Sequence, residues 1–464
     1  MKKRIGLGVF ESARAMNSNK VAWTHPESRH AEYTSLDFWV QMARMLDDAG
    51  FDYLFFADGY SYPITDDGRA GEMAMKNGSL PGVESSMLLA TLAYATRTLG
   101  IVATTPTGLD HPIQTARRFA SIDHLSGGRI GWNMVTGSGQ DTIARLFGHD
   151  AMRGHEARYE IAYEYVDLCL RYWEGCWEDD AVVRDRATGT YADVARVHRI
   201  DVDGKFYRTS GYLAVEPSPQ RTPVLFQAGT SETGKDFAAR YAECVFVKSD
   251  TMERTAASIA DIRRRAEALG RNGDDIKMYS SISVMAGRTS EDAHAFRRSF
   301  LELQSDEAVA STYRNLAGID LLALDPSLPL TQRPEGASLG EFNQSDVAKY
   351  MPHDGKPAPT VREILDDLKG YTPSDWVVVG DGVEVADKLE RIADATGLDG
   401  FMLQPALDIA ELKRFIDYAL PELERRGRRE PRPEGSTFRE RMFGSSRLKP
   451  THPGAAYRVA PVAR

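Results

Sequence analysis

The sequence predicts an α/β protein, a TIM-type (β/α)8 barrel with insertions and an extended C-terminal tail. Short, nearly continuous apolar runs alternate with longer amphipathic segments, the pattern of a parallel sheet covered by helices on both faces. Several of these runs end in polar residues, and in barrels the active site lies at the carboxyl ends of the strands. The chain has 464 residues, and a barrel with insertions can exceed about 400 residues as one domain.

The elements of the first half follow in barrel order. Ile5–Phe10 is the first candidate strand. Ser35 then caps a helix that Gly50 ends, with one apolar face made of Phe38, Trp39, Met42, Ala43 and Leu46. Further strands are predicted at Phe51–Ala57, Ile101–Thr105 and Arg129–Val135. Helices are predicted through Met87–Thr98, Thr115–His124 and Arg158–Trp173.

The alternation resumes after residue 222. Strands are predicted at Pro223–Ala228, Cys244–Lys248, Lys277–Ala286 and Gly400–Gln404. Helices are predicted through Phe237–Tyr241, Ala256–Ala268 and Ile409–Leu423. Of these eight apolar runs we count seven as strands of the barrel, and we expect the eighth strand either between Val166 and Pro223 or near Trp376–Val379.

The domain organisation follows from the two breaks in this rhythm. Residues 1–425 are expected to form one barrel domain with insertions near 178–222 and 321–374. The first insertion is rich in Asp, Arg, Gly and Tyr and is predicted to be β-rich. A surface elaboration explains this first insertion equally well. The second is rich in Pro, Ser and Gly, and it is expected to be a mobile lid that sets substrate choice, with a surface insertion or a subunit contact as the alternative. Residues 426–464 are expected to pack on the barrel or on a neighbouring subunit.

Composition excludes several classes of protein. The net charge of −10 and the pI near 5.6 argue against nucleic-acid binding and against an anionic membrane surface. No apolar stretch is long enough to span a bilayer, and Ile5–Phe10 is too short for a signal peptide. The three cysteines, an odd number without a CxxC pair, favour a reducing cytosol and make a thiolate zinc site improbable. We therefore expect a soluble cytoplasmic protein.

Polar residues at the ends of the apolar runs are the candidates for a site. They are Asp58, Thr104, Thr105, Asn133, Thr136, Gln227 and the turn Gly229-Thr230-Ser231. In the turn, glycine lets a ligand approach the backbone, and the helix start that follows attracts an anion such as phosphate. An ordinary helix cap explains Thr230 and Ser231 equally well.

Two further patterns are less specific. Asn133 and Thr136, spaced by apolar residues, could hydrogen-bond a planar heterocycle or simply bond the backbone. His155 and Tyr159 lie four residues apart, so they share one helix face. They could hold the polar tail of a cofactor, although a plain helix-surface role is the commoner outcome for such a pair.

Competing motifs are incomplete. Gly6-Leu-Gly8 lacks the third glycine of a nicotinamide-binding fingerprint, and there is no GxxxxGK[ST], HExxH or GxSxG motif. His25 and His30 could be read as a metal pair, but no strand carries the His-x-His of a metal-dependent barrel hydrolase. We expect no metal.

The collinear set of short motifs resembles the nitrilotriacetate, dibenzothiophene-sulfone and long-chain-alkane monooxygenase branch of the bacterial luciferase superfamily. The similarity runs nearly end to end. The motifs are Trp23–Pro26, Phe51–Asp58, Arg117–Leu125, Gly128–Thr136, His155–Tyr159, Leu170–Gly175, Trp177–Asp180, Glu216–Val224, Gln227–Ser231, Ala242–Phe246 and Thr437–Gly444.

This resemblance implies a two-component monooxygenase that receives FMNH2 from a separate NAD(P)H:FMN oxidoreductase. It implies that O2 adds at flavin C4a and that the peroxyflavin oxygenates a small organic molecule. The implied assembly is a homodimer or homotetramer. The positions that match the family's FMN contacts are Asp58, Thr104, Asn133, Thr136, His155, Tyr159, Thr230 and Ser231, of which Thr230 and Ser231 would hold the phosphate.

The sequence departs from the alkane-oxidising relatives at several places. Those enzymes carry Cys and His in the N-terminal loop, where this chain has Arg14 and Asn17, and a further His where this chain has Ser138. The resemblance therefore does not support a long-chain alkane substrate. Asn17, Tyr60 and Ser138 are the substrate-side candidates, and no catalytic acid or base is assigned. The alternatives are a flavin-degrading enzyme of the riboflavin lyase type and a non-catalytic flavin- or F420-binding barrel.

Overall fold

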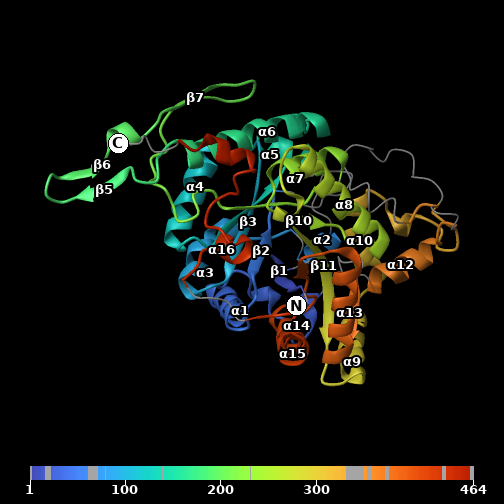
Figure 1. Ribbon diagram of the computed structural model, residues 1–464. Coiled ribbons are helices and arrows are strands. Elements are labelled where there is room, and N and C mark those ends of the chain that lie inside the picture. The colour runs from blue at the N-terminus through green and yellow to red at the C-terminus, as the bar shows by residue number, and fades with distance from the viewer. Residues whose placement is uncertain are drawn as a thin grey trace.

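A closed barrel of parallel strands forms the centre of the molecule, and helices surround it (Figure 1). The computed structural model describes residues 3–15, 22–60, 72–78, 80–137, 141–229, 231–330, 350–352, 357–370, 376–430 and 435–459. The barrel strands are β1 (Gly6–Ser12), β2 (Tyr53–Ala57), β3 (Gly100–Pro106), β4 (Ile130–Val135), β9 (Val224–Gln227), β10 (Cys244–Val247), β11 (Lys277–Ala286) and β13 (Gly400–Leu403).

The ring closes between the first and last of these strands. β1 pairs with β2 in the register Gly8↔Tyr53 and with β13 in the register Gly6↔Gly400. At the other side of the ring, β10 pairs with β11. Each of the eight strands thus has two parallel neighbours, which confirms the predicted TIM-type barrel.

The two places suggested for an eighth strand were wrong. The eight apolar runs of the sequence are the eight barrel strands, so no further strand is needed from either region suggested for it. Residues 377–380 do form a strand, β12 (Val377–Gly380), but it pairs only with the last residues of β11 and stands outside the ring. An apolar run predicts a strand, but it does not reveal whether that strand belongs to the closed ring.

The helices cover the barrel with the faces that their periodicity predicts. In α1 (Leu36–Asp48), the five residues of the predicted apolar face are all buried, and Gly50 follows with the positive φ of a helix stop. The other covering helices are α3 (Leu89–Ala95), α4 (Pro112–Leu125), α6 (His155–Leu170), α7 (Glu232–Tyr241), α8 (Met252–Ala268), α9 (Ser290–Leu301), α13 (Gly382–Thr396), α14 (Asp408–Arg414) and α15 (Leu420–Arg425).

The tail reaches back to close the amino-terminal end of the barrel with α16 (Phe438–Phe443). Phe438 belongs to the apolar cluster inside the barrel, and its ring lies 6.0 Å from that of Tyr53 and 6.2 Å from that of Phe226. Arg439 is fully buried. It donates to Glu243 at 2.8 Å and to the carbonyl oxygens of residues 220, 222 and 223. The tail therefore forms the floor of the barrel.

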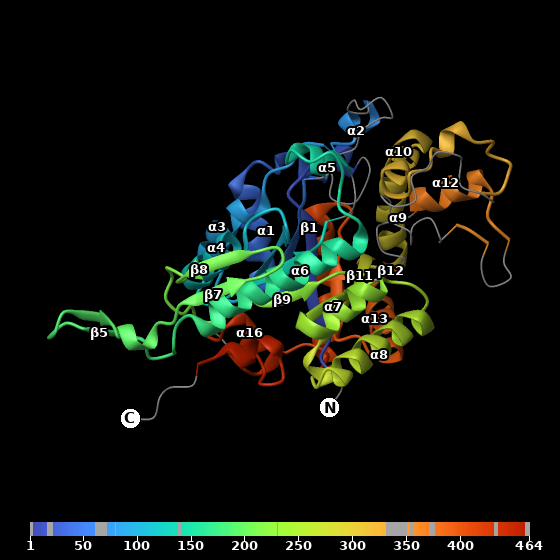
Figure 2. The same cartoon turned by 90° about the horizontal axis from the view of Figure 1, so that it is seen from above.

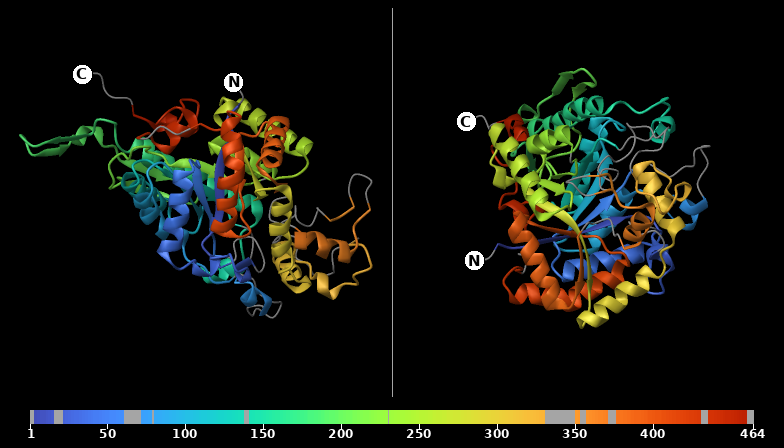
Figure 3. Two further views of the ribbon diagram at one scale, coloured as in Figure 1. Left: turned by 90° about the horizontal axis from the view of Figure 1, so that it is seen from below. Right: turned by 90° about the vertical axis from the view of Figure 1, so that its right-hand side faces the viewer.

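Residues 178–222 contain two small antiparallel sheets. One is the hairpin of β5 (Val182–Asp185) and β6 (Thr190–Ala192), which projects from the body in Figures 1 and 2 and in the left view of Figure 3. The other pairs β7 (Ile200–Asp203) with β8 (Arg208–Gly211), and it is held to α6 because Glu164 accepts hydrogen bonds from Phe206 N and Tyr207 N. This second hairpin becomes a wall of the site.

The second insertion is less irregular than its composition predicts. Within it, α12 (Val361–Gly370) shares an apolar cluster, which includes Tyr313 and Leu330, with α10 (Asp306–Ala317), a helix that precedes the insertion. They form a lobe beside the barrel mouth (Figure 2). Residues 331–349, 353–356 and 371–375, on which the lid expectation also depends, lie outside the described residues. No helix of the described ranges is both long and apolar enough to cross a membrane.

Candidate functional site

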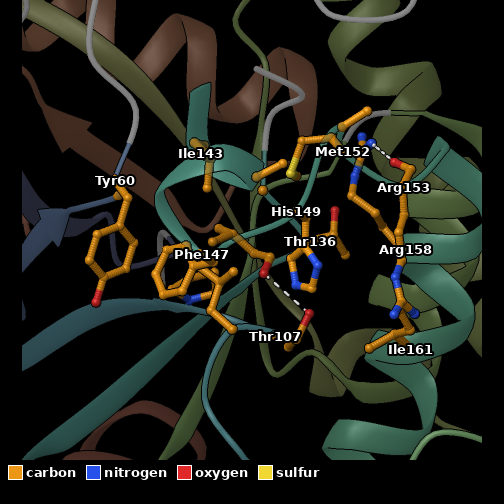
Figure 4. Close-up of a pocket in the computed structure, with 18 of the residues that line it drawn as sticks. Tyr60, Thr107, Thr136, Ile143, Phe147, His149, Met152, Arg153, Arg158 and Ile161 are labelled. Atoms are coloured by element: carbon orange, nitrogen blue, oxygen red, sulfur yellow. Dashed lines mark hydrogen bonds between the residues drawn. The ribbon is translucent and has the colours of Figure 1, made fainter. Parts of the chain in front are cut away.

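Two cavities lie next to each other at the carboxyl ends of the strands. Cavity 1 has a volume of about 540 Å³, and cavity 2 a volume of about 440 Å³. Both are lined by Asp58, Gly59, Tyr60, Pro106 and Leu109, so the end of β2 and the end of β3 separate them. Cavity 1 continues under the short helix α5 (Asp141–Leu146) toward α6 and the β7–β8 hairpin, and Figure 4 shows its lining.

Asp58 stands on the boundary between the cavities and is held by three hydrogen bonds. Its carboxylate accepts from Gly59 N at 2.7 Å, from Ser85 N at 2.7 Å and from Ser85 Oγ at 2.8 Å. These bonds fix the start of the 3-10 helix η3 (Ser85–Leu88). Asp58 is therefore a turn-forming residue as well as a lining residue.

Thr104 and Asn133 form a buried pair on neighbouring strands. The Thr104 hydroxyl donates to Phe56 O at 2.7 Å and accepts from Asn133 Nδ2 at 2.9 Å. Asn133 is 4% exposed, and its Oδ1 has no hydrogen-bond partner among the described residues. The same holds for Oε1 of Gln404, which follows β13 and is also 4% exposed. Buried polar atoms are normally satisfied, so these two oxygens are candidate hydrogen-bond acceptors for a polar ligand at the mouth.

The turn after β9 brings three of the predicted phosphate-end residues together. Ser231 caps α7, because its Oγ accepts from Gly234 N at 3.0 Å, and it also lies 3.2 Å from His155 Nε2. The rings of His155 and Tyr159 are 5.0 Å apart. Burial raises the pKa of Tyr159, while the hydroxyls of Ser231 and Thr136 act in the opposite direction.

A side chain at Gly229 would force its neighbours to shift. A methyl group there would stand 2.2 Å from Gln227 Nε2 and 2.7 Å from the hydroxyl oxygen of Tyr159. The glycine therefore lets these two side chains approach the backbone of the turn closely. Thr230, predicted for the same end, lies outside the described residues.

The remaining predicted residues fall into three groups. Thr136 lines cavity 1, and Thr104 lines cavity 2. Tyr60 lines both, and its ring meets that of Phe147 edge-to-face at 5.1 Å. Asn17 and Ser138 lie outside the described residues. His155, Tyr159 and Ser231 stand together but line neither cavity.

The structure adds residues that the strand-end pattern does not reach. Gln404 ends an apolar run that was recognised, so the same rule applied once more would have found it. Arg158 and Phe147 line cavity 1 from a helix and from the segment after α5. No local sequence signal distinguishes them from surface residues. Within the described ranges, no group of His, Cys, Asp and Glu side chains is arranged to hold a metal ion.

Comparison with known proteins gives consistent matches over the whole chain. A family model described as luciferase-like monooxygenase matches residues 16–400. The dimethyl-sulfide monooxygenase of Hyphomicrobium sulfonivorans is 37% identical, over 100% of this chain and 96% of that enzyme. The long-chain alkane monooxygenase of Geobacillus thermodenitrificans strain NG80-2 is 35% identical, over 99% of both chains. A crystal structure of riboflavin lyase with modified FMN and substrate riboflavin has a TM-score of 0.90 and 36% identity, covering 99% of this chain and 100% of that one.

Proposed function

The chain belongs to the luciferase-like monooxygenase family, and from this premise we propose that it is a two-component monooxygenase using FMNH2 and O2. The proposed substrate is a small organic molecule that enters at the barrel mouth. The observation that carries the proposal is the juxtaposition of a polar, incompletely satisfied barrel mouth with a phosphate-type turn, as a flavin mononucleotide would require.

The residues fit FMN at both ends. The unpaired Oδ1 of Asn133 and its partner Thr104 suit the hydrogen-bonding edge of a flavin ring. The α7 start, with Ser231 and the Tyr159 hydroxyl beside Gly229, suits a phosphate because backbone amides and the helix dipole attract anions. Asp58 and Thr136, which line cavity 1, would border the ring and the ribityl chain, and His155 would lie near the phosphate beside Ser231.

A bound reduced flavin supplies the two electrons with which one atom of O2 enters the substrate while the other becomes water. The task of this chain is to orient the ring, anchor the phosphate and keep water out. Asn133 and Thr104 would orient the flavin ring. The hydrogen bonds from Asn133 to Thr104 and from Thr104 to Phe56 O hold both side chains in place. The rings of Tyr60, Phe147 and Phe206 and the side chains of Ile143 and Ile161 give cavity 1 apolar walls.

The test is oxygen uptake by purified protein with FMN, NADH and a generic flavin reductase, screened against a library of organic sulfides, amines and alkanes. We expect substrate-dependent O2 consumption and a product that carries one atom of ¹⁸O from ¹⁸O2. Protein that binds FMN yet yields no labelled product with any compound would contradict the proposal. Asn133→Asp, which keeps the size but exchanges an amide for a charge, is expected to lose activity.

A second candidate function, cleavage of a flavin, is favoured by the likeness to the riboflavin lyase structure. Under this alternative the substrate is itself a flavin, and cavities 1 and 2 together accommodate a second ring system. Incubation with excess riboflavin under the same conditions distinguishes the two. Loss of riboflavin with release of a free isoalloxazine-type product supports cleavage, and intact riboflavin supports oxygenation of another molecule.

A further inference from the structure

Arg158 brings a positive charge into cavity 1 without a negative partner. It lies on the first turns of α6 and is half-buried, and together with Ile161, Phe206 and Tyr207 it lines the end of the cavity remote from Tyr60. Its Nη1 donates to the carbonyl oxygen of Arg153 at 2.6 Å, and its Nε is buried with no partner among the described residues. In the described part of the chain, no carboxylate lies within ion-pair distance of it.

The charges around cavity 1 are predominantly positive. Arg153 lines the same end, and His149 lies between the arginines and the opposite wall (Figure 4). Asp58 is the one carboxylate among the described lining residues, and three hydrogen bonds already engage it at the far side. A chain with a net charge of −10 therefore presents a local positive surface inside a largely apolar cavity.

An arginine remains charged in a protein, and taking that charge partly out of water is unfavourable unless an anion compensates it. Burial lowers the pKa of Arg158, and no carboxylate raises it. The fork of guanidinium N–H groups matches the geometry of a carboxylate, sulfonate or phosphate. The neighbouring β7–β8 hairpin holds the cavity wall against α6 through Glu164, so the position is built into the fold.

We propose that Arg158 is the anion-binding residue of cavity 1 and receives an oxyanion there. The oxyanion has two sources that share this chemistry: the phosphate of the cofactor, or a carboxylate or sulfonate on the substrate. The inference rests on the proposed function, since both sources belong to an FMN-dependent oxygenase.

The experiment compares ligands that differ only in the anion. Dissociation constants of FMN and of riboflavin, which lacks the phosphate, are measured by flavin fluorescence for the wild type and for Arg158→Met. Octanoate and 1-octanol are then titrated by calorimetry into the FMN-saturated proteins. Arg158→Lys keeps the positive charge but lacks the planar pair of guanidinium N–H donors, so it separates the effect of the charge from that of the geometry. Arg186→Met, on the exposed β5–β6 hairpin, is the matched control, and thermal melting verifies that each variant is folded.

Because Arg158→Met removes a hydrogen bond to a charged group, we expect it to lower the affinity for one anionic ligand by at least about tenfold. Weaker FMN binding with unchanged riboflavin binding identifies the cofactor phosphate. Unchanged FMN binding with loss of the preference for octanoate over octanol identifies a substrate acid. Equal weakening of FMN and riboflavin, or no change in any ligand, overturns the inference. Wild-type protein that fails to bind FMN contradicts the proposed function instead, so the two failures are distinguishable.

Discussion

At the scale of single residues, Ser231 has two possible roles, the capping of a helix and the binding of the proposed phosphate. Ser231 caps α7 through Gly234 N and also faces His155. A cap contributes about 1 kcal/mol to stability, and a hydrogen bond to a charged ligand about 1.5–3 kcal/mol to binding. The two roles are therefore separable by measuring stability and affinity in the same variants.

We predict that Ser231→Ala and Tyr159→Phe each weaken FMN binding by roughly tenfold or more. Fluorescence titration with FMN measures the effect. Thr251→Ala is the matched control, because Thr251 caps α8 in the same manner through Arg254 N and stands outside the predicted site. It should lose similar stability and retain FMN affinity. Full affinity in both site variants would move the phosphate away from this turn.

At the scale of elements, four buried titratable groups join the end of β1 to η2 (His30–Glu32) and α14. His30 lies 3.4 Å from Glu11 and 3.5 Å from Asp408, and all three are fully buried. Glu411 accepts from Ala406 N and Leu407 N. Burial, reinforced by Asp408 and Glu11, raises the pKa of Glu411 to about 8, and the pKa values of Glu11 and His30 are also raised.

We predict that stability falls as the pH rises from about 4.5, the ordinary pKa of a glutamate, to about 8, the raised pKa of Glu411. A group whose pKa is higher in the folded state stabilises the fold while it is protonated, and for Glu411 that contribution is lost as the pH rises through about 8. For each pH unit between the unfolded and the folded pKa values, the free energy of unfolding falls by about 1.4 kcal/mol. Glu411→Gln should keep both backbone hydrogen bonds and flatten the dependence of Tm on pH. Glu424→Gln, an exposed change on α15, should leave it unaltered. A steep pH dependence that survives in Glu411→Gln would assign it to other groups.

The floor formed by α16 gives a second prediction at this scale. Burial alone would raise the pKa of Glu243, but Arg439 holds it below its ordinary value. Arg439→Met leaves that carboxylate buried and uncompensated, so we expect the free energy of unfolding to fall by about 3–5 kcal/mol in urea denaturation. Arg447→Met breaks a more exposed ion pair of the same tail with Asp179 and should lose about 1 kcal/mol or less. Similar losses in the two variants would show that Arg439 acts only by packing.

The elements also show how far sequence reasoning reaches. The carboxyl end of a strand can be recognised from residues that are neighbours in the sequence. The rule that an apolar run ends in polar residues therefore placed Asp58, Thr104 and Asn133 at the mouth. The surroundings of a side chain on a helix depend, in contrast, on which other elements pack against that helix. Arg158 faces a cavity only because residues 200–211, far later in the chain, fold back along α6. That long-range contact cannot be predicted from the periodicity of the sequence, and neither can the pairing of β12 with the end of β11.

At the scale of the whole molecule, the described residues form one barrel, whose mouth would hold the proposed flavin, and no nicotinamide-binding fold stands beside it within the described ranges. The incomplete glycine pattern at Gly6-Leu-Gly8 lies in β1, where those glycines admit the rings of Tyr279 and Tyr53 instead of a pyrophosphate. We predict that purified protein with FMN oxidises NADH no faster than free FMN does, and that an added flavin reductase restores turnover. Rapid NADH oxidation without the reductase would contradict the two-component proposal.

The closure of the ring has a consequence for biosynthesis. Gly6 pairs with Gly400, and the floor depends on residues 438 and 439. A nascent chain emerges from its amino terminus, so β1 leaves the ribosome with one edge unpaired and waits for nearly the entire polypeptide before its second neighbour exists. Ribosome-bound intermediates therefore expose an open sheet, and a premature stop codon anywhere before residue 438 removes the floor.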